Sequence, residues 1–538
     1  MRRDIDPQDY HDRTKHRPER YAASLGYMDW ANQPDPFRRF EGAPLRRLSG
    51  EAWEGPRFGD VVAGSVRPEP LDFRFLDRLL FLSFALSAWK AIPGSRWSLR
   101  VNPSSGNLHP TEAYLLVPLP ETPTLYHYAP HEHGLEERAR LGDDSWAELT
   151  RGLPDECMFI GLTSIHWREA WKYGERAYRY CQHDAGHAIG AVAYAAACLG
   201  WRAQLLTAVT DSDLAELLGV ANQSGAEAEH ADCLMVLHAA NTEVDLERFA
   251  IPAGARADVT KTLSGEPNKL CANYHSWPVI DEVATACLKT DSTGVCETGW
   301  ENARGRVPGA TDSMAATTVI RNRRSAVAMD GRTSIDRATF YRMLDRTLAG
   351  EDRIPHAVLP WRPRIHLALF VHRVDGLPPG LYMLERSGDP GLRSFLGADW
   401  DWRTPEGCPD HLSLFFVNES DARPTAKASS CHQDIAADGC FAVAMLGEFE
   451  ESIRTHGPWF YRALHWESGV IGQTLYLEAE RAGIRSTGIG CFFDDLTHEV
   501  VDYEGHGLQV IYHFTVGGAV DDERLQTLPA YEHLGPDG

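Results

Sequence analysis

The chain has 538 residues, of which 53 are basic and 76 are acidic, so its formal net charge at pH 7 is -23. An acidic chain of this kind repels phosphate backbones, which excludes a general nucleic-acid-binding function. With 43% hydrophobic and 24% charged residues it has the composition of an ordinary globular protein. Its length exceeds what one hydrophobic core usually covers and predicts two domains.

Targeting signals are missing from the sequence pattern. The chain opens on the charged segment Met1–Asp4, and no apolar run reaches the length that a membrane helix requires. The 11 cysteines are odd in number and form no Cys-x-x-Cys pair, which favours reduced, structural thiols. We therefore expect a cytoplasmic protein with neither a nucleic-acid nor a membrane partner.

The first half of the chain begins with an arm. Residues 1–70 are rich in Arg, Asp, Pro and Gly but contain aromatic residues, which disordered tails usually lack, so we expect an irregular arm packed on the body. Apolar residues from Leu71 to Trp89 predict a buried helix. The other elements predicted here are strands at Tyr114–Leu119, near Leu125–Tyr128 and at Phe159–Thr163, and a long helix at Tyr173–Leu199 that Gly200 ends.

The second half repeats the first. Residues 220–315 are weakly patterned and are predicted to connect two domains, with a short helix at Val279–Leu288. The predicted elements that follow are a helix at Ile335–Leu348, strands at Arg364–His372 and Leu381–Leu384 that match those around Leu115 and Tyr126, a strand at Leu412–Val417 matched with Phe159, and a long helix at Phe460–Ala482. The expected division is an arm at 1–70, a first domain with the connecting segment at 71–305 and a second domain at 306–538.

A polar loop precedes the first predicted strand. Asn102–Tyr114 reads Asn-Pro-Ser-Ser-Gly-Asn-Leu-His-Pro-Thr-Glu-Ala-Tyr. Proline fixes φ and glycine admits unusual backbone geometry, while Ser and Asn supply short polar arms, so the loop is expected to hold a rigid polar surface. By composition alone it is also compatible with an ordinary turn that leads into a buried strand.

Within this loop, Pro103, Ser104, Ser105, Gly106 and Asn107, followed by His109-Pro110, resemble the loop that contacts the isoalloxazine of FMN in the nitroreductase superfamily. With Arg100 before it and Glu112-Ala113-Tyr114 after it, the loop is most similar to that of the SagB-type dehydrogenases, a branch that includes azoline oxidases of ribosomal peptides. The resemblance implies an α+β fold with two nitroreductase-like domains, each a mixed sheet flanked by helices. The two domains would form a pseudo-dimer within one chain.

The second half contains a segment that is similar to the superfamily's Arg-Arg-Ser motif. The resemblance implies that Arg323, Arg324 and Ser325 bind the FMN phosphate, a role suited to guanidinium forks. The superfamily usually has another basic residue two positions after the serine, where this chain has Val327, and Arg321 is the expected substitute. The alternative interpretation is a basic helix start that faces solvent.

The remaining parts of the expected FMN site are divided between the halves. By resemblance, Gly488 and Gly490 border the flavin. The first half has Ala203–Thr207 at the matching point and lacks an Arg-Arg-Ser segment, whereas the second half has Leu359–Pro363 in place of the polar loop. The sequence therefore predicts one composite FMN site, with the loop from one half and the phosphate-binding residues from the other.

Lys172 and Tyr173 precede the long helix of the first half, as a Lys-Tyr pair does in the SagB-type branch. The resemblance implies that Lys172 removes a proton while the flavin accepts hydride, and that Tyr173 donates or relays a proton. The alternative is a solvated lysine beside a packing tyrosine. The histidine groups at His183 and His187 and at His127, His131 and His133 do not make a convergent zinc site, so no metal is expected.

These observations favour an FMN-dependent dehydrogenase that oxidises a peptide-derived heterocycle or a Cα–Cβ bond, with a small-molecule or peptide substrate. The first alternative is an NAD(P)H-dependent nitro- or quinone reductase on the same fold. The second is a flavin-free scaffold that binds a peptide or partner protein in a biosynthetic complex.

Overall fold

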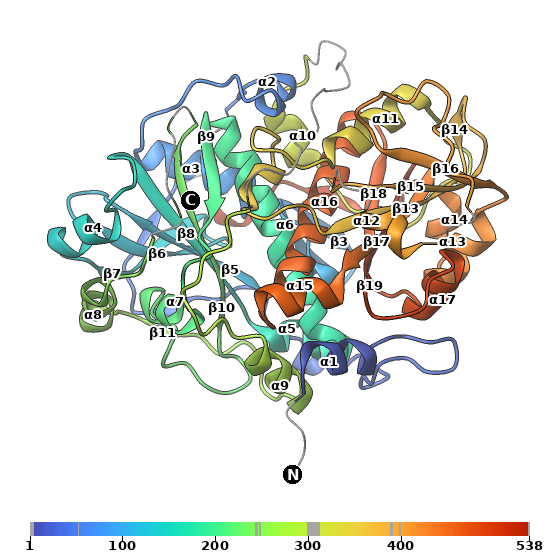
Figure 1. The fold of residues 1–538 in the computed structure, drawn as a ribbon. Helices are drawn as coiled ribbons and strands as arrows, with labels where there is room; N and C mark the ends of the chain where they lie inside the picture. The colour runs from blue at the N-terminus through green and yellow to red at the C-terminus, as the bar shows by residue number, and fades with distance from the viewer. Residues whose placement is uncertain are drawn as a thin grey trace.

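The computed structural model describes residues 5–51, 53–240, 242, 246, 249–297, 313–387, 391–396 and 400–535. Two large sheets lie on either side of a pair of long central helices, and shorter helices cover the outside (Figure 1). The expected boundary between residues 305 and 306 falls outside the described residues. No helix in the described part of the chain combines the length and apolarity needed to cross a membrane.

The first sheet has seven strands, in the order β2 (Leu45–Arg47), β7 (Gly134–Arg140), β6 (Thr124–Ala129), β5 (Thr111–Val117), β8 (Cys157–Ser164), β10 (His230–Ala239) and β9 (Trp201–Leu205). The strands predicted around Leu115, Tyr126 and Phe159 are therefore confirmed. The connection predicted from residue 220 onward is wrong at its start, because β10 lies there and pairs with β8 and β9. Both faces of β10 are covered, so the strand shows no alternation that the sequence pattern could reveal.

The second sheet has six strands, in the order β16 (Leu414–Glu419), β15 (Gly380–Leu384), β13 (Ile365–Val371), β17 (Phe441–Glu448), β19 (Leu508–Gly517) and β18 (Arg485–Ile489). Strands β15, β13, β17, β19 and β18 follow the same order as β6, β5, β8, β10 and β9. The match of Leu412–Val417 with Phe159 is wrong, because β16 lies beside β15 as β7 lies beside β6, and β17 is the counterpart of β8. Short apolar runs do not distinguish an edge strand from a central one.

The predicted α+β fold with helix-flanked sheets is confirmed, but the strand directions are not mixed. Every pairing described within the two large sheets is antiparallel. The reason is the connectivity: β5, β6 and β7 follow one another through short turns, and such turns join only antiparallel neighbours.

The two central helices, α6 (Ala177–Cys198) and α16 (Phe460–Arg481), pack closely against each other. Gly186 lies against the carbonyl oxygen of Trp466, and Gly469 lies against the carbonyl oxygen of His183, so a Cβ atom at either glycine would overlap with backbone. The two glycines make the same contact in opposite directions. This reciprocity indicates a local two-fold relation between the helices.

The long helix predicted at Tyr173–Leu199 is confirmed as α6 (Ala177–Cys198), but it begins later than predicted. Helix α5 (His166–Tyr173) ends at Gly174, whose φ of 56° is in the left-handed region, and a 3-10 turn at Gly174–Arg176 leads into α6. A Cβ atom on Gly174 would overlap with the backbone of Ala23 and Ser24. The N-terminal arm thus passes so close that the helix cannot continue through this point.

The helix predicted from Leu71 to Trp89 extends too far. Helix α3 (Phe73–Ser83) is followed by β3 (Leu86–Ile92), which pairs with β4 (Ser95–Arg100) and with β20 (Gln526–Leu528) near the C-terminus. Pairing with a strand that is more than 400 residues away in sequence overrides the local helical pattern.

The other described elements surround this frame. The helices at Val279–Leu288 and Ile335–Leu348 are confirmed as α9 (Pro278–Ala286) and α11 (Arg337–Arg346). The remaining helices are α1 (Pro7–Arg13), α2 (Phe58–Val62), α4 (Asp143–Leu149), α7 (Asp211–Leu217), α8 (Ala253–Thr262), α10 (Ala316–Asn322), α12 (Gly391–Phe395), α13 (Arg423–Ser429), α14 (Ile435–Asp438), α15 (Phe449–His456) and α17 (Asp494–Val500). Two small sheets pair β1 (Phe40–Glu41) with β11 (Glu266–Pro267) and β12 (Ile335–Asp336) with β14 (Val374–Asp375).

A buried ion cluster links the arm to both halves. Arg176 and Arg179, at the start of α6, contact the two carboxylate oxygens of Asp494 at 3.1 and 2.8 Å. Arg176 also donates to the carbonyl oxygen of Thr14 in the arm, at 2.6 Å. Burial alone would raise the pKa of Asp494, but the two guanidinium groups hold it at about 2.

We expect Asp494→Asn to lower the free energy of unfolding at pH 7 by roughly 3–5 kcal/mol, because two guanidinium groups would be left buried without their carboxylate. A carboxylate with a depressed folded pKa stabilises the fold above its unfolded pKa, and this contribution is lost as the pH falls through the folded value. The difference between wild type and variant should therefore shrink from about pH 4 toward pH 2. Chemical denaturation at several pH values measures it.

The matched control is Asp421→Asn, since Asp421 pairs with Arg423 at the exposed surface. We expect its denaturation midpoint to equal that of the wild type. Equal midpoints for Asp494→Asn and the wild type at pH 7 would contradict the stabilising role of the cluster.

Candidate functional site

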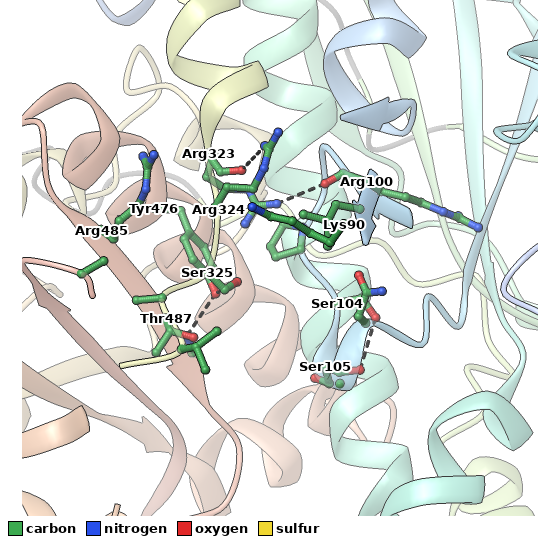
Figure 2. A pocket seen from close by; sticks show the side chains of 18 of the residues that line it. Lys90, Arg100, Ser104, Ser105, Arg323, Arg324, Ser325, Tyr476, Arg485 and Thr487 are labelled. Atoms are coloured by element: carbon green, nitrogen blue, oxygen red, sulfur yellow. Dashed lines mark hydrogen bonds between the residues drawn. The ribbon is translucent and has the colours of Figure 1, made fainter. Parts of the chain in front are cut away.

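A cavity of about 1020 Å³ lies beside the central helices α6 and α16, which both contribute residues to its wall. Its wall includes the 102–109 loop, residues of β3 and β4, the 322–327 segment, β18 and the segment 519–527 near the C-terminus (Figure 2). The predicted site residues that line it are Pro103, Ser104, Ser105, Gly106, Asn107, Tyr173, Arg323, Arg324, Ser325, Gly488 and Gly490. Lys172 and Arg321 are not part of the cavity wall. The structure thus brings together most of a site whose parts come from both ends of the chain.

The 102–109 loop is held in an unusual backbone conformation. Gly106, Asn107 and His109 have φ values of 59°, 61° and 52°, in the left-handed region. Three hydrogen bonds maintain it: Asn107 Nδ2 donates to the Ser98 carbonyl at 2.9 Å, the His109 ring and Asn107 Oδ1 lie 3.0 Å apart, and the His109 N–H donates to Ser104 Oγ at 2.8 Å. The loop is therefore a rigid part of the wall, as predicted from its composition.

Asp184 on α6 holds the 102–109 loop in place through hydrogen bonds to Ser105. The backbone N–H and the hydroxyl of Ser105 both donate to Asp184 Oδ1, each at 3.0 Å. Burial raises the pKa of Asp184 to about 7, although hydrogen bonds from Ser104 and Ser105 oppose this shift. Near neutral pH the carboxyl group can therefore hold or release a proton at the edge of the cavity.

Basic side chains gather at the other end of the cavity. Lys90, Arg323, Arg324 and Arg485 line it, and Figure 2 shows Lys90 close to Arg323 and Arg324. Burial lowers the pKa of Arg323 to about 10, and burial together with Arg323, Arg321 and Arg485 lowers the pKa of Arg324 to about 9. Both guanidinium groups remain charged at neutral pH. Crowded cations of this kind are stabilised by an anion, and phosphate suits them.

The arginine segment also anchors the loop strand. Arg323 donates through Nε and one terminal nitrogen to the carbonyl oxygens of Val101 and Arg100, both at 3.1 Å. Arg324 donates to the carbonyl oxygens of Arg321 and Arg323 at 2.8 and 2.6 Å. Each guanidinium carries five N–H groups, so some N–H donors of Arg323 and Arg324 remain available to bind a ligand.

Arg321 lies outside the cavity wall. Its guanidinium stacks on the ring of Phe81 at 3.7 Å and donates to the Phe81 carbonyl oxygen at 3.1 Å. Lys90 of β3 and Arg485 of β18 instead add basic groups to the wall beside Arg323 and Arg324. Val327, at the position where the superfamily usually has a basic residue, is 87% exposed.

Ser325 is tied to the second sheet through Tyr476 on α16. The Ser325 and Tyr476 hydroxyls lie 2.8 Å apart, and the backbone N–H of Gly488 donates to the same tyrosine oxygen at 3.1 Å. Ser325 also forms a parallel bridge with Ser486 of β18. The serine and glycine motifs therefore meet at one tyrosine, which the motifs themselves do not include.

The two glycines after α16 leave room for tyrosines. A Cβ atom on Gly488 would overlap with the hydroxyl group of Tyr512, and one on Gly490 would overlap with the ring of Tyr180. The Tyr512 ring stacks on His183 with centroids 4.1 Å apart, and its hydroxyl lies 3.3 Å from His187 Nε2. The glycines are needed to seat these aromatic rings in the wall.

The predicted acid–base pair lies directly behind the loop. A Cβ atom on Gly106 would be 2.7 Å from the Tyr173 hydroxyl and 3.0 Å from Lys172 Nζ. Burial raises the pKa of Tyr173 well above its ordinary value, so its hydroxyl remains a donor. Tyr173 stacks on Tyr180 with centroids 4.3 Å apart. The fully buried Glu169 lies near Lys172 and Asp184, and burial raises its carboxyl pKa.

The histidine groups have structural partners. His183 Nε2 lies 3.1 Å from the Ile511 carbonyl oxygen, and His127 lies between the carboxylates of Glu112 and Glu136 at 3.1 and 2.9 Å. Within the described residues, no three His, Cys, Asp or Glu side chains are arranged to hold a metal ion.

Among the wall residues that the sequence did not identify are Lys90, Tyr180, Asp184, His187, Tyr476, Arg485 and Tyr512. Asp184, Tyr180 and His187 follow helical spacing along α6, which could have placed them on the loop side once the loop was located. Lys90 lies on β3, which pairs with the distant strand β20, and no local pattern marks it. Arg485 and Tyr512 lie on the neighbouring strands β18 and β19, and no motif includes them.

Residues 81–236 match the model of the Nitroreductase family. A candidate nitroreductase from Anabaena variabilis has a similar structure, with a TM-score of 0.69 at 23% sequence identity over 96% of this chain and 99% of that chain. This similarity shows that the α+β fold is nitroreductase-like.

Two solved structures resemble less of the chain. A candidate nitroreductase from Ralstonia eutropha has a TM-score of 0.28 at 17% identity and covers 39% of this chain and 95% of its own. The Escherichia coli microcin synthetase McbBCD complex with truncated pro-MccB17 bound has a TM-score of 0.27 at 21% identity. The match covers 44% of this chain and 92% of the chain in that structure. A comparison with functionally curated proteins gave no match.

We expect Gly488→Ala to destabilise the protein by about 1–3 kcal/mol, because the added methyl group displaces the Tyr512 hydroxyl from a packed site. Gly391→Ala is the control, since its nearest neighbour would be 3.5 Å away, and its effect should stay within about 0.5 kcal/mol. Urea denaturation compares the two variants. Equal stability of Gly488→Ala and the wild type would show that Tyr512 can move freely.

Proposed function

We propose that the chain is an FMN-dependent oxidoreductase that holds a single flavin in a composite site between its two halves. The observation that carries this proposal is the 1020 Å³ cavity, which has the polar 102–109 loop in one part of its wall and Arg323, Arg324 and Ser325 in another. A cavity of this volume is in the range of cofactor sites.

The chemistry of the wall fits FMN. The basic cluster suits the phosphate, and four tyrosines, Tyr173, Tyr180, Tyr476 and Tyr512, supply flat apolar surface with polar tips. Four polar atoms of wall residues are buried without a hydrogen-bond partner among the described residues, namely Arg100 Nε, Asn102 Oδ1, His109 Nδ1 and His187 Nδ1. Such atoms are costly unless a ligand satisfies them.

We further propose that the two halves are a tandem duplication that forms an intrachain pseudo-dimer. Reciprocal contacts support it. The Phe58 N–H donates to the Met314 carbonyl, and the Ala316 N–H donates to the Pro56 carbonyl, both at 2.9 Å. This pair of bonds relates α2 to α10, as the Gly186 and Gly469 contacts relate α6 to α16. By the same relation, Ser65, Val66 and Arg67 are at the positions equivalent to Arg323, Arg324 and Ser325.

The position related to the main cavity by this symmetry holds a second, smaller cavity of about 240 Å³. Its wall includes Val66, residues of β9 and the acidic residues Glu351 and Asp352. Ala193 occupies the same position along α6 as Tyr476 does along α16. The wall also includes one basic residue, Arg202, but two acidic ones and no Arg-Arg-Ser segment. This cavity therefore does not suit a phosphate, which supports one flavin per chain.

For the reaction, a bound flavin supplies an acceptor for hydride. The residues of the chain then have separate roles. Arg323, Arg324 and Ser325 hold the phosphate, and Ser104, Ser105 and Asn107 hold the loop that positions the ring. Lys172, whose Nζ lies directly behind Gly106 of the cavity wall, takes a proton from the substrate, and Tyr173, whose hydroxyl stays protonated, donates a hydrogen bond beside it. We propose a dehydrogenase that oxidises a peptide-derived heterocycle or a Cα–Cβ bond.

A second candidate is an NAD(P)H-dependent nitro- or quinone reductase, favoured by the match of residues 81–236 to the Nitroreductase family. Anaerobic addition of NAD(P)H distinguishes the two. Rapid bleaching of the flavin absorption would favour the reductase, whereas slow or no bleaching favours the dehydrogenase.

We expect Arg324→Ala to weaken FMN binding by one to two decades, because losing one charge-assisted phosphate contact costs roughly 1.5–3 kcal/mol. Titration with FMN, followed by quenching of its fluorescence, measures the affinity. Arg403→Ala is the control, since Arg403 forms an exposed pair with Asp401 and is not part of the cavity wall. Unchanged affinity in Arg324→Ala would refute the assignment of the phosphate end.

We expect Lys172→Ala to retain FMN and to lower turnover of an azoline-containing peptide by about 10²- to 10⁴-fold, the usual effect of losing a general base. Lys172→Arg keeps the charge but has too high a pKa to act as a base, so it should be equally impaired. Steady-state assays with both variants test this. Full activity in Lys172→Arg would assign Lys172 an electrostatic role instead.

A further inference from the structure

Two cysteines lie together beside the flavin cavity. Cys491 follows β18 directly and lines the cavity, and Gln433, two residues after Cys431, lines it as well. The Cys431 and Cys491 side chains interact electrostatically with each other, and both residues are free cysteines of intermediate exposure. No role in the proposed flavin chemistry uses either thiol.

The backbone holds this pair in place. Cys431 and His432 have φ values of 51° and 60°, a left-handed conformation that non-glycine residues adopt at a cost. Gln433 Nε2 donates to the carbonyl oxygens of Cys491 and Ser430, both at 2.9 Å. The Phe493 N–H also donates to the Ser429 carbonyl oxygen at 2.8 Å. The turn that carries Cys431 is thereby fixed to the segment that carries Cys491.

His16 of the N-terminal arm completes the group. Its Nδ1 accepts a hydrogen bond from the Ala22 N–H at 2.9 Å, so a neutral ring carries its proton on Nε2. His16 also interacts electrostatically with the Cys491 thiol. The Cys431 thiol and His16, as donors, hold the pKa of the Cys491 thiol below its ordinary range, and the same contact raises the pKa of Cys431. Cys491 therefore has thiolate character and Cys431 remains a thiol.

We propose that Cys491 and Cys431 form a redox-active thiol pair in the wall of the cavity, in which Cys491 reacts with hydrogen peroxide and Cys431 resolves the product to a disulfide. In the first step the Cys491 sulfur attacks one peroxide oxygen, the O–O bond breaks, and the product is a sulfenic acid; the leaving hydroxide takes up a proton to give water. In the second step the Cys431 sulfur attacks the Cys491 sulfur, the S–S bond forms, the S–O bond breaks, and water leaves. The two thiols lose two electrons, and the peroxide is reduced to two molecules of water.

The test uses the reduced full-length protein and one equivalent of hydrogen peroxide, followed by alkylation and peptide mapping by mass spectrometry. The wild type should yield a Cys431–Cys491 disulfide peptide. Cys431→Ser should accumulate a sulfenic acid at Cys491 that dimedone labels, and Cys491→Ser should leave Cys431 as a free thiol. Circular dichroism of each variant establishes that it is folded. Because the readout is the mass of the peptides, the test does not depend on bound flavin or on its activity.

Cys408 is the internal control, because it has intermediate exposure and burial raises its pKa to about 11. Dimedone labelling at Cys491 in Cys431→Ser should be at least about tenfold faster than at Cys408, as expected for a thiolate compared with a thiol. Adding His16→Ala to Cys431→Ser should slow the dimedone labelling at Cys491. Two results would overturn the proposal: recovery of both Cys431 and Cys491 as free thiols in the wild type, or labelling of Cys491 and Cys408 at equal rates.

Discussion

The close packing of α6 on α16 determines the geometry of the whole site. Gly186 and Gly469 let the two helices approach until each glycine lies against the backbone of the other helix. Tyr180, Asp184 and His187 extend from α6, and Tyr476 extends from α16, so the helix separation determines the distance between the loop and the phosphate end. A methyl group at either glycine would push apart the halves that share the cavity.

Charge is distributed unevenly over the molecule. The chain as a whole carries a net charge of -23, yet Lys90, Arg323, Arg324 and Arg485 line one cavity. Burial lowers the pKa values of Arg323 and Arg324, which means that the fold holds these cations at a cost. A bound phosphate would offset that cost, whereas the acidic surface elsewhere disfavours anions. The buried cluster of Arg176, Arg179 and Asp494 is different, because its charges compensate one another within the protein.

The sequence predicted the parts of the fold and site that depend on local patterns. The 102–109 loop and the Arg323–Ser325 segment were singled out because each resembles a contiguous motif of the nitroreductase superfamily, and both line the cavity. Strand β10 was missed because a strand buried on both faces has no alternation, and β3 was assigned to a helix because its partner β20 lies near the other end of the chain. Lys90 could be placed in the cavity wall only once the long-range pairing of β3 with β20 was known. Arg321 was predicted to bind the phosphate, but its guanidinium stacks on Phe81 outside the cavity wall. No sequence motif indicates this contact.

The most direct test of this account is the number of flavins per chain. The purified full-length protein, saturated with FMN and freed of excess cofactor, gives this ratio from its flavin absorbance and its protein concentration. The account predicts one FMN per chain, bound in the 1020 Å³ cavity, because the 240 Å³ cavity lacks the basic residues of the phosphate end. Two flavins per chain, or none after saturation, would contradict it.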